Sequence, residues 1–444
     1  MMDTPILDFV EEYRSSHTAR LHMPGHKGVS FLGCEGLDIT EIKGADALYE
    51  ADGIIARSEE NAAALFGTER TLYSTEGSSQ CIRAMLYLAL TGRREGASPV
   101  IVAARNVHKA FVYAAALLDL EVVWLWPGET DSLCACPVTA QTLEKTLSAL
   151  SAPPAAVYVT SPDYLGNVQD IAALAEVAHR HGTVLAVDNA HGAYLRFLPQ
   201  PCHPMDLGAD ICCDSAHKTL PVLTGGAYLH ISKTAPAALG ENAKAAMALF
   251  GSTSPSYLTL LSLDRCNRYL ADDYPKRLEE TARRLDGLRG ALRQRGWQVA
   301  ESDPLRITVA APEGLSGSDL AEKLRRGGVE CEFADRDFLV LMATPENREE
   351  DFMRLLETLG ENTRPAAEGT FLPLPKGEQV CSIRKAFFAP HRSLPAGAAL
   401  GRICAAPTVA CPPAIPIAVS GERLGEEALA LFAHYGVESV DVLL

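Results

Sequence analysis

The chain is 444 residues long, a length that predicts two or three domains rather than one. Hydrophobic residues form 47% of it and charged residues 22%, proportions typical of a globular protein with a sizeable core. Its 40 Lys and Arg residues against 56 Asp and Glu residues give a formal charge of −16, which disfavours a nucleic-acid-binding surface and favours cationic small molecules as partners.

Membrane and secreted classes are also disfavoured. The N-terminal segment MMDTPILDFVEEYRSS carries acids and lacks the apolar core of a signal peptide. No run of the sequence approaches the roughly 18 apolar residues of a membrane-spanning helix. The 12 cysteines include no CxxC pair, so we expect no metal site and a reduced, cytoplasmic protein.

The first 50 residues predict a helix followed by an irregular polar segment. Apolar residues recur at helical spacing from Pro5 to Ser16. The segment LHMPGHKG, residues 21–28, is rich in His and Gly and is broken by Pro24, which rules out a regular element. Such a segment is either a surface loop or a loop laid over a polar crevice, and the residues alone leave both open.

A glycine–serine turn precedes the helix that ends near Leu90. Asp52–Phe66 has the apolar spacing of a helix, and Gly67 is suited to ending it. A strand then leads through Gly77-Ser78-Ser79 into a helix that reaches about Leu90. Backbone N–H groups and hydroxyls at such a turn suit a phosphate group. An ordinary serine N-cap accounts for the same pattern.

Strands and helices alternate over the following residues, which is typical of a parallel sheet in an α/β protein. Strands are predicted at Pro99–Ala103, Glu121–Trp126 and Ala156–Thr160, and helices at Val107–Leu117 and Ile171–His181. His108 opens the first of these helices, after the carboxyl end of a strand. It is either a polar capping neighbour or a side chain that stacks on a cofactor ring and moves protons.

Two chemically distinctive side chains follow strands in the middle of the chain. The run Thr183–Val187 predicts a buried strand that ends at Asp188. A second strand, Asp210–Cys213, leads into Lys218. Because ligands of open α/β sheets bind at the carboxyl ends of strands, we expect Asp188 and Lys218 to meet in one crevice.

An aspartate and a lysine in this arrangement are what pyridoxal phosphate (PLP) requires. The lysine amine forms a Schiff base with PLP, and the carboxylate keeps the pyridine nitrogen protonated so that the ring accepts electrons. Taken singly, Asp188 would more commonly be a cap and Lys218 a solvated charge. Lys218 lies between two apolar strands, however, the second at Ala227–Ile231, where a solvated lysine is unusual.

The C-terminal part of the chain predicts two smaller domains. A long charged helix, about Tyr274–Gly296, leads to mixed strands and helices that end with the helix Glu349–Leu359. A polar linker covers residues 361–372, and a Pro-rich tail with one helix and one short strand follows it. The predicted division is 1–50 as N-terminal helix and active-site loop segment, 51–272 as large cofactor-binding domain, 273–362 as small α+β domain, and 363–444 as C-terminal domain.

Together these segments resemble the Orn/Lys/Arg decarboxylases, PLP enzymes of the fold-type I, aspartate-aminotransferase-like superfamily. The resemblance runs nearly end to end, and the chain looks most like the short bacterial form, which lacks a receiver-like N-terminal domain. The matching segments are LHMPGHKG, DITEIKGADALYEADGII, YSTEGSS, RNVHKA, TSPDYLGN, VDNAHGAY, DSAHKTL, GSTSPSY and CPPAIPIAVSGE. HMPGHKG together with DSAHKTL is specific, since few other PLP enzymes carry both.

The resemblance implies a large α/β domain with a mostly parallel, doubly wound sheet, followed by smaller α+β domains. It implies an enzyme of polyamine biosynthesis that converts a basic amino acid to its amine and CO2. Arginine is the favoured substrate, with lysine and ornithine as alternatives. It also implies a homodimer or a higher homo-oligomer with shared active sites, and no nucleic-acid or membrane partner.

The resemblance further assigns individual residues. Lys218 is expected to carry PLP, Asp188 to pair with the pyridine nitrogen, and His108 to stack on the ring, where His108 and Lys218 are candidates to return a proton to the substrate carbon. Ala190 would pack beneath the ring, and Thr253 would reach the cofactor of the partner subunit. The phosphate would be held by Ser78, Ser79, Ser215 and His217, and the full cofactor-binding set is Gly77, Ser78, Ser79, His108, Asp188, Ala190, His191, Ser215, His217, Lys218 and Thr253.

Two acids depart from the family pattern. Asp163 replaces the second threonine of a T-x-P-T-Y loop, and Glu76 stands where many members have a neutral residue. Solvated loop acids are the expectation, and a contact with the cationic end of the substrate is the alternative.

Two other functions stay open at this point. An aminotransferase or a β-eliminating lyase would use the same cofactor, and Arg306, Arg336 and Arg384 are candidates for the α-carboxylate clamp of an aminotransferase. A non-catalytic relative would have lost its Schiff-base lysine, whereas Lys218 is present with its neighbours.

Overall fold

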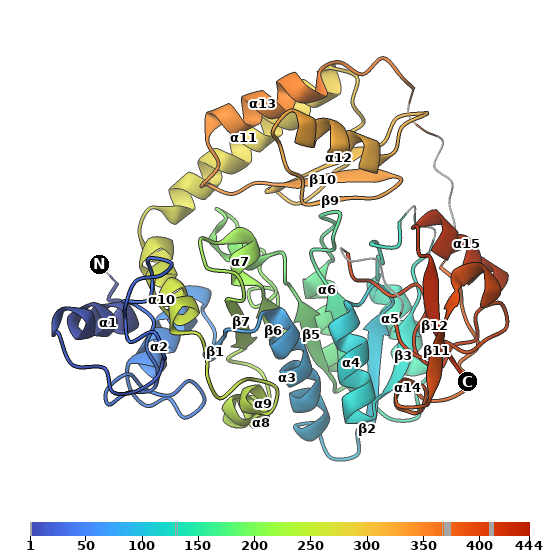
Figure 1. Ribbon diagram of the computed structural model, residues 1–444. Helices are drawn as coiled ribbons and strands as arrows, with labels where there is room; N and C mark the ends of the chain where they lie inside the picture. Colours follow the sequence, from blue (N-terminus) through green and yellow to red (C-terminus); the bar gives the residue numbers. More distant parts are fainter. Residues whose placement is uncertain (1, 129, 131, 366, 368–373, 408–412) are drawn as a thin grey trace. The chain divides into compact units, whose positions relative to one another are not determined.

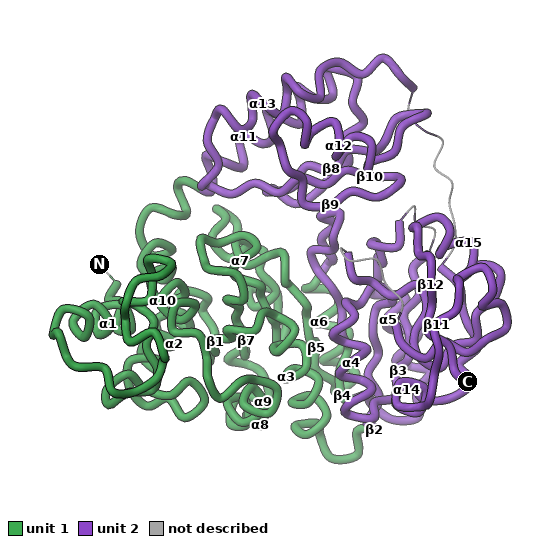
Figure 2. Tube along the Cα trace, in the orientation of Figure 1, with its two compact units in different colours: residues 1–97, 155–157, 171–277 green, residues 98–154, 158–170, 278–444 purple. Residues whose placement is uncertain are grey.

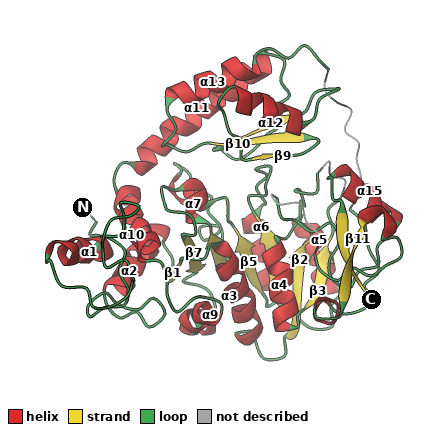
Figure 3. Ribbon diagram, in the orientation of Figure 1, coloured by secondary structure: helices red, strands yellow, loops and turns green. Residues whose placement is uncertain are grey.

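A seven-stranded sheet in the order β1-β7-β6-β5-β4-β2-β3 carries the fold of the computed structural model (Figure 1, Figure 3). The structure describes residues 2–128, 130, 132–365, 367, 374–407 and 413–444. Contacts divide the chain into two units (Figure 2): unit 1 consists of residues 1–97, 155–157 and 171–277, and unit 2 of residues 98–154, 158–170 and 278–444. The four predicted domains stay a prediction.

Unit 1 contains four strands that pair in the order β1-β7-β6-β5. The bounds are β1 Arg70–Ser74, β5 Val184–Asp188, β6 Ile211–Asp214 and β7 Ala227–Ile231. β5 and β6 are parallel, whereas β7 is antiparallel to both β1 and β6. Nearly every residue of these strands is buried, as expected of short apolar strands that are covered on both faces.

The helices of unit 1 include the predicted helices at Pro5–Ser16, Asp52–Phe66 and Ile171–His181. Their bounds are α1 Pro5–Ser15, α2 Ile54–Phe66, α3 Ser78–Thr91, α6 Ile171–Arg180, η1 Ala193–Phe197, α7 Ala216–Thr219, α8 Ala237–Glu241, α9 Ala243–Leu249 and α10 Tyr257–Ala271. Gly67 ends α2 with a φ of 71°, a left-handed conformation that costs little without a Cβ.

The buried carboxylate of Asp264, on α10, fixes the start of α1. Its Oδ2 accepts the backbone N–H groups of Ile6 and Leu7, each at 3.0 Å. These N–H groups belong to the first helical turn, where no intrahelical acceptor exists. Ser58 of α2 donates to the other oxygen at 2.6 Å, so one side chain joins three helices.

Unit 2 contains the other part of the large sheet and two smaller sheets. β2 Ser98–Ala104 and β3 Glu121–Leu125 pair in parallel, and β8 Arg306–Ala310, β10 Phe338–Met342 and β9 Phe333–Ala334 form an antiparallel sheet in that order. β11 His391–Pro395 and β12 Ser439–Leu443 form an antiparallel pair. β4 Pro154–Thr160 and α11 Tyr274–Gln294 are divided between the two units. The other helices of unit 2 are α4 Lys109–Leu118, α5 Ala140–Ser148, α12 Gly317–Arg326, α13 Glu349–Leu359, α14 Ile383–Phe387, η2 Ala396–Ala398 and α15 Glu426–His434.

A buried arginine joins the N-terminal and C-terminal parts of unit 2. The guanidinium of Arg105, which follows β2, donates to the carbonyls of Pro416 at 2.8 Å and Ile417 at 3.0 Å. The carboxylate of Glu422 lies 3.5 Å from the same guanidinium. Because both charged side chains are almost fully buried, these contacts fix the C-terminal segment on the end of β2.

The predicted α/β class is confirmed, and most predicted elements lie within one or two residues of the observed bounds. α5 was not predicted, although Leu143 and Leu147 recur at helical spacing and are buried. The predicted linker lies outside the described residues at 366 and 368–372, as do the first two residues of CPPAIPIAVSGE. None of the described helices is both long enough and apolar enough to cross a membrane.

Candidate active site

The carboxyl ends of β5 and β6 meet at one edge of the sheet in unit 1. The strands are parallel, and Asp188, which ends β5, lies opposite Cys213 of β6. The chain leaves β6 through Ser215 and enters α7, which contains Lys218. The two strand ends predicted to carry Asp188 and Lys218 are therefore neighbours.

Asp188 lies inside the protein, with only 2% of its surface exposed. Its Oδ1 accepts the backbone N–H of Ala190 at 3.2 Å and lies 3.6 Å from the thiol sulfur of Cys213. These contacts fix the orientation of the carboxylate at the strand end. A buried, oriented carboxylate is what a protonated ring nitrogen needs as a partner.

Lys218 contacts a side chain from the segment after β5. Its Nζ lies 2.9 Å from Nε2 of His191, which is itself buried. Only the resemblance pointed to His191, and the structure now places it beside the predicted cofactor-bearing lysine. The segments that follow β5 and β6 therefore meet through their side chains as well as through the sheet.

The start of α3 provides a second group of donors in unit 1. Gly77 is the N-cap residue, has a φ of 72° and offers no capping side chain, so the first amides of the helix are left to another acceptor. The interpretation of this turn as a serine N-cap is therefore wrong. The hydroxyl of Ser78 lies 2.8 Å from that of Ser215, and Ser79 follows in the first turn.

This set of donors fits PLP. First-turn amides and the hydroxyls of Ser78 and Ser215 are suited to a phosphate, and unit 1 also holds the buried carboxylate and the lysine that the pyridine ring and the aldehyde require. Ala190, predicted to pack beneath the ring, is 7% exposed.

His217 and Thr253, two other predicted cofactor ligands, also belong to unit 1. The ring of His217 lies with Nδ1 3.0 Å from the carbonyl oxygen of Gly226, so Nδ1 carries the proton and donates it there. Thr253 is exposed, in the segment between α9 and α10. Their roles at the phosphate and at a partner's cofactor stay predictions.

His108, the predicted stacking residue, belongs to unit 2. It is the N-cap residue of α4, and its Nδ1 accepts the backbone N–H of Ala110 at 3.1 Å. In a neutral ring this bond places the proton on Nε2. The capping interpretation is confirmed, and the stacking role stays a prediction.

The expectation that Asp163 is a solvated loop acid is wrong. The side chain is 1% exposed and accepts hydrogen bonds from the backbone of Leu165 at 2.9 Å and of Asn167 at 3.0 Å, which organises its own loop. Burial raises the pKa of Asp163 to about 6. Glu76 is exposed as expected, and its carboxylate accepts the backbone N–H of Ser252.

Two of the three arginines that were candidates to bind a substrate α-carboxylate make hydrogen bonds within unit 2. Arg306 is buried, donates to the carbonyl of Asp163 and pairs with Asp303 at 3.1 Å. Arg384 donates to two carbonyls at the end of α4. Arg336 is exposed. The guanidinium groups of Arg306 and Arg384 are therefore engaged in contacts within unit 2.

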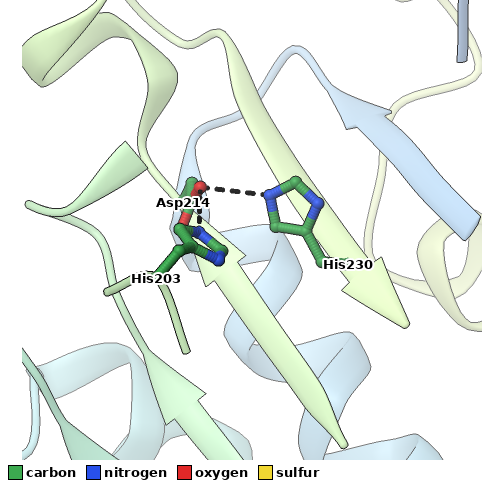
Figure 4. A group of neighbouring side chains, drawn as sticks. All are labelled: His203, Asp214 and His230. Carbon is green, nitrogen blue, oxygen red and sulfur yellow. Dashed lines mark hydrogen bonds and ion pairs between the residues drawn. The ribbon is translucent and has the colours of Figure 1, made fainter. Parts of the chain in front are cut away.

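A buried group in unit 1 was not predicted. The side chains of His203 and His230 both lie within hydrogen-bonding distance of Asp214 (Figure 4). The available signal was a histidine inside the apolar strand AYLHI, since a buried polar residue needs a partner. His203 lies in an irregular segment, which is why its contact with Asp214 left no pattern in the sequence.

The amino-acid sequence matches a known protein family. Residues 4–311 match the model of the Orn/Lys/Arg decarboxylase major domain. An arginine decarboxylase of Bacillus subtilis is 29% identical over 96% of this chain and 92% of its own length.

Solved structures agree on the fold. A lysine decarboxylase of Francisella novicida superposes with a TM-score of 0.81 at 16% identity, over 99% of this chain and 81% of its own. A variant of the serine palmitoyltransferase of S. paucimobilis with bound PLP superposes with a TM-score of 0.53 at 17% identity, over 68% of this chain and 74% of its own. The architecture is that of fold-type I PLP enzymes, and the chain belongs to the Orn/Lys/Arg decarboxylase family, a group of PLP-dependent carboxy-lyases.

Proposed function

We propose that this protein binds PLP at Lys218 and decarboxylates a basic amino acid, with arginine as the preferred substrate. The observation that carries the proposal is that parallel strands β5 and β6 end side by side, and that Lys218, after β6, contacts His191, three residues after Asp188, at 2.9 Å. Arginine is favoured because the arginine decarboxylase of Bacillus subtilis resembles this chain over 96% of its length.

The residues of unit 1 would hold the cofactor at its phosphate, at its ring nitrogen and, through Lys218, at its aldehyde. The amides of the first turn of α3, with Ser78, Ser79 and Ser215, would bind the phosphate. Asp188 would keep the proton on the ring nitrogen, since its carboxylate is buried and oriented. Bound in this way, PLP withdraws electrons from the bond between the substrate Cα and its carboxylate.

Proton movement would involve the side chains of Lys218 and two histidines. His191 Nε2 lies 2.9 Å from Lys218 Nζ, so the imidazole can exchange a proton with the lysine amine. The ring of His108, whose Nδ1 accepts the Ala110 amide, would stack on the cofactor ring, and its Nε2–H would transfer a proton to Cα.

The same proposal includes a homodimer in the cytoplasm. A segment of unit 1 exposes several large apolar side chains, among them Leu21 at 96%, Leu32 at 89% and Phe31 at 77% exposure. Apolar side chains gathered on one segment are typical of an interface between subunits. The described cysteines are all free thiols, which fits a reducing compartment.

Release of CO2 from arginine, lysine and ornithine tests the function, with PLP-loaded protein and identification of each product amine. One dominant amine supports the proposal and names the substrate. The Lys218→Ala protein is the matched control, since it keeps the fold and removes the amine. Transfer of the amino group to an oxo acid, without CO2 release, would contradict decarboxylation and support the aminotransferase alternative.

A further inference from the structure

Asp214, the last residue of β6, accepts hydrogen bonds from two histidine rings. Its Oδ2 lies 3.0 Å from Nε2 of His203 and 3.1 Å from Nε2 of His230, and all three side chains are fully buried. Figure 4 shows both rings turned toward the carboxylate. The ring of Phe66 packs 4.5 Å from that of His230, so an apolar side chain closes the group on that side.

The remaining ring nitrogens define the protonation of this group. The backbone N–H of Met205 donates to Nδ1 of His203 at 3.2 Å, so the proton of the neutral ring lies on Nε2 and is donated to Asp214. Nδ1 of His230 lies 2.8 Å from the hydroxyl of Thr71, which donates to it in the same tautomer. Both neutral rings therefore serve as donors to one carboxylate.

The three side chains have the composition of a metal site, but their hydrogen bonds oppose metal binding. A metal ion on Nε2 of His203 would place the ring proton on Nδ1, where it would face the N–H of Met205. Two donors would then oppose each other inside the protein. The group is better described as a closed hydrogen-bond network around an anion.

The network holds its charge in spite of burial. Burial opposes ionisation, but the neighbouring His203 and His230 bring the pKa of Asp214 well below its usual value. Burial lowers the pKa of His230. At neutral pH the carboxylate is therefore ionised, and the ring of His230 remains a neutral donor.

The second carboxylate oxygen extends the network to the proposed active site. Oδ1 of Asp214 accepts the side-chain N–H of Asn189 at 2.7 Å, and the backbone N–H of Asn189 donates to the carbonyl of Cys213 at 3.0 Å. Asn189 follows Asp188 directly. Asp214 precedes Ser215, whose carbonyl accepts the backbone N–H of Lys218 at 3.0 Å.

We propose that Asp214 is a positioning residue that fixes the segments bearing Asp188 and Lys218 relative to each other. The buried carboxylate of Asp214 accepts a hydrogen bond from Asn189, the residue after Asp188. Through the backbone, Asp214 is joined directly to Ser215, which begins the turn that leads to Lys218. The consequence for catalysis rests on the proposed function, whereas the consequence for the two segments does not.

The test compares the same substitution at the two ends of β6. Asp214→Asn keeps the size of the side chain, but its amide N–H₂ replaces one acceptor oxygen and opposes a donor. Asp210→Asn is the matched control, because Asp210 is also a buried aspartate and accepts from His179 at 2.9 Å and from the backbone of Leu185 at 2.8 Å. It lies before β6, away from the strand end that leads to Lys218.

Two measurements separate positioning from simple loss of stability. The first is the acylation rate of Lys218 in the full chain without PLP, measured by mass spectrometry relative to the other lysines. The second is the visible circular dichroism of bound PLP, which reports the orientation of the cofactor. We expect Asp214→Asn to change the acylation rate and the dichroism, and to lower kcat about 10- to 100-fold with little change in KM, while Asp210→Asn changes none of the three.

Equal effects of the two substitutions on all three readouts would overturn the proposal. If Asp214→Asn does not fold, Asn189→Ala takes its place, since it removes only the 2.7 Å bond between Asp214 and the segment of Asp188. Unchanged acylation of Lys218 in Asn189→Ala would then count against positioning. Failure of the wild-type protein to bind PLP would reject the proposed function, and the acylation comparison would still decide the role of Asp214.

Discussion

Two regions of unit 1 differ in the exposure of their side chains to solvent. At the ends of β5 and β6, Asp188, Asn189 and Asp214 are buried and hydrogen-bonded within the unit. In residues 21–32, by contrast, Leu21, Phe31 and Leu32 expose most of their side-chain surface.

The exposed region is nevertheless an ordered turn. The carboxylate of Glu35 accepts the backbone N–H groups of Phe31, Leu32 and Gly33, and these bonds bring the pKa of Glu35 down to about 2 despite the opposing effect of burial. A turn fixed by its backbone with apolar side chains outward is suited to contact with another chain. The comparison teaches that the chain itself buries the hydrogen-bonded residues at the ends of β5 and β6, whereas the apolar side chains of the turn would be buried only by a partner.

The largest effect is expected at Lys218. Lys218→Ala removes the amine that would hold PLP, so the visible absorbance of the bound cofactor and the release of CO2 should both be lost. Absorption spectra after removal of free PLP measure the first. Retention of the wild-type absorbance would show that another residue holds the cofactor and that the strand-end region has been misassigned.

Asp188→Asn should affect turnover more than binding. The amide keeps the shape of the carboxylate but cannot stabilise a protonated ring nitrogen, so we expect kcat to fall about 100- to 1,000-fold while PLP remains bound. Steady-state kinetics and the bound-cofactor absorbance measure the two quantities. Turnover within a few-fold of wild type would remove Asp188 from the proposed chemistry.

Asp264 makes the start of α1, the helix that precedes the exposed turn, sensitive to pH. Burial raises the pKa of Asp264 from 3.8 to about 6, so the folded protein binds this proton more tightly than the unfolded chain does. Its stabilisation is complete below about pH 4 and is lost as the pH rises through about 6, a change of about 2 to 3 kcal/mol.

Asp264→Asn removes this titration. The free energy of unfolding of the variant minus that of wild type should therefore rise between about pH 4 and pH 7 and then become constant. Urea unfolding at a series of pH values measures the difference. A difference that is independent of pH over this range would contradict a raised pKa at Asp264.

Leu32→Ser tests whether the apolar turn is an interface. Burial of one leucine side chain is worth about 2 kcal/mol, so the dissociation constant of the dimer should rise about 30-fold. Sedimentation equilibrium measures it. Leu249→Ser is the matched control, since Leu249 is also exposed in unit 1 but belongs to α9. An equal change in both variants, or none in either, would place the interface elsewhere.

The same contrast explains what the sequence could predict. Asp188 and Lys218 were predictable because each follows a short apolar strand, and parallel strands place their carboxyl ends together. The hydrogen bonds from His203 and His230 to Asp214 were not predictable, since they join residues 11 and 16 positions apart whose spacing follows no helix or strand period. The burial of Asp163 was also not predicted. The backbone hydrogen bonds that make it possible depend on the conformation of its own irregular loop, which has no sequence period.

The smallest effect is expected at Thr253. Its substitution tests whether cofactor binding at the ends of β5 and β6 depends on dimer formation through the apolar turn. Thr253 is exposed in one chain, and its proposed contact with cofactor would be made across the dimer. Loss of one hydrogen bond in Thr253→Ala is worth about 1 kcal/mol and should weaken PLP binding about fivefold. Ser254→Ala, one residue further in the same exposed segment, should leave PLP binding unchanged. At protein concentrations where Leu32→Ser dissociates the dimer, this substitution should weaken PLP binding as Thr253→Ala does. Adding Thr253→Ala to Leu32→Ser should then have no further effect. Full PLP saturation and activity in a Leu32→Ser monomer would show instead that each chain holds its cofactor alone, and the exposed turn would then serve assembly without serving the site.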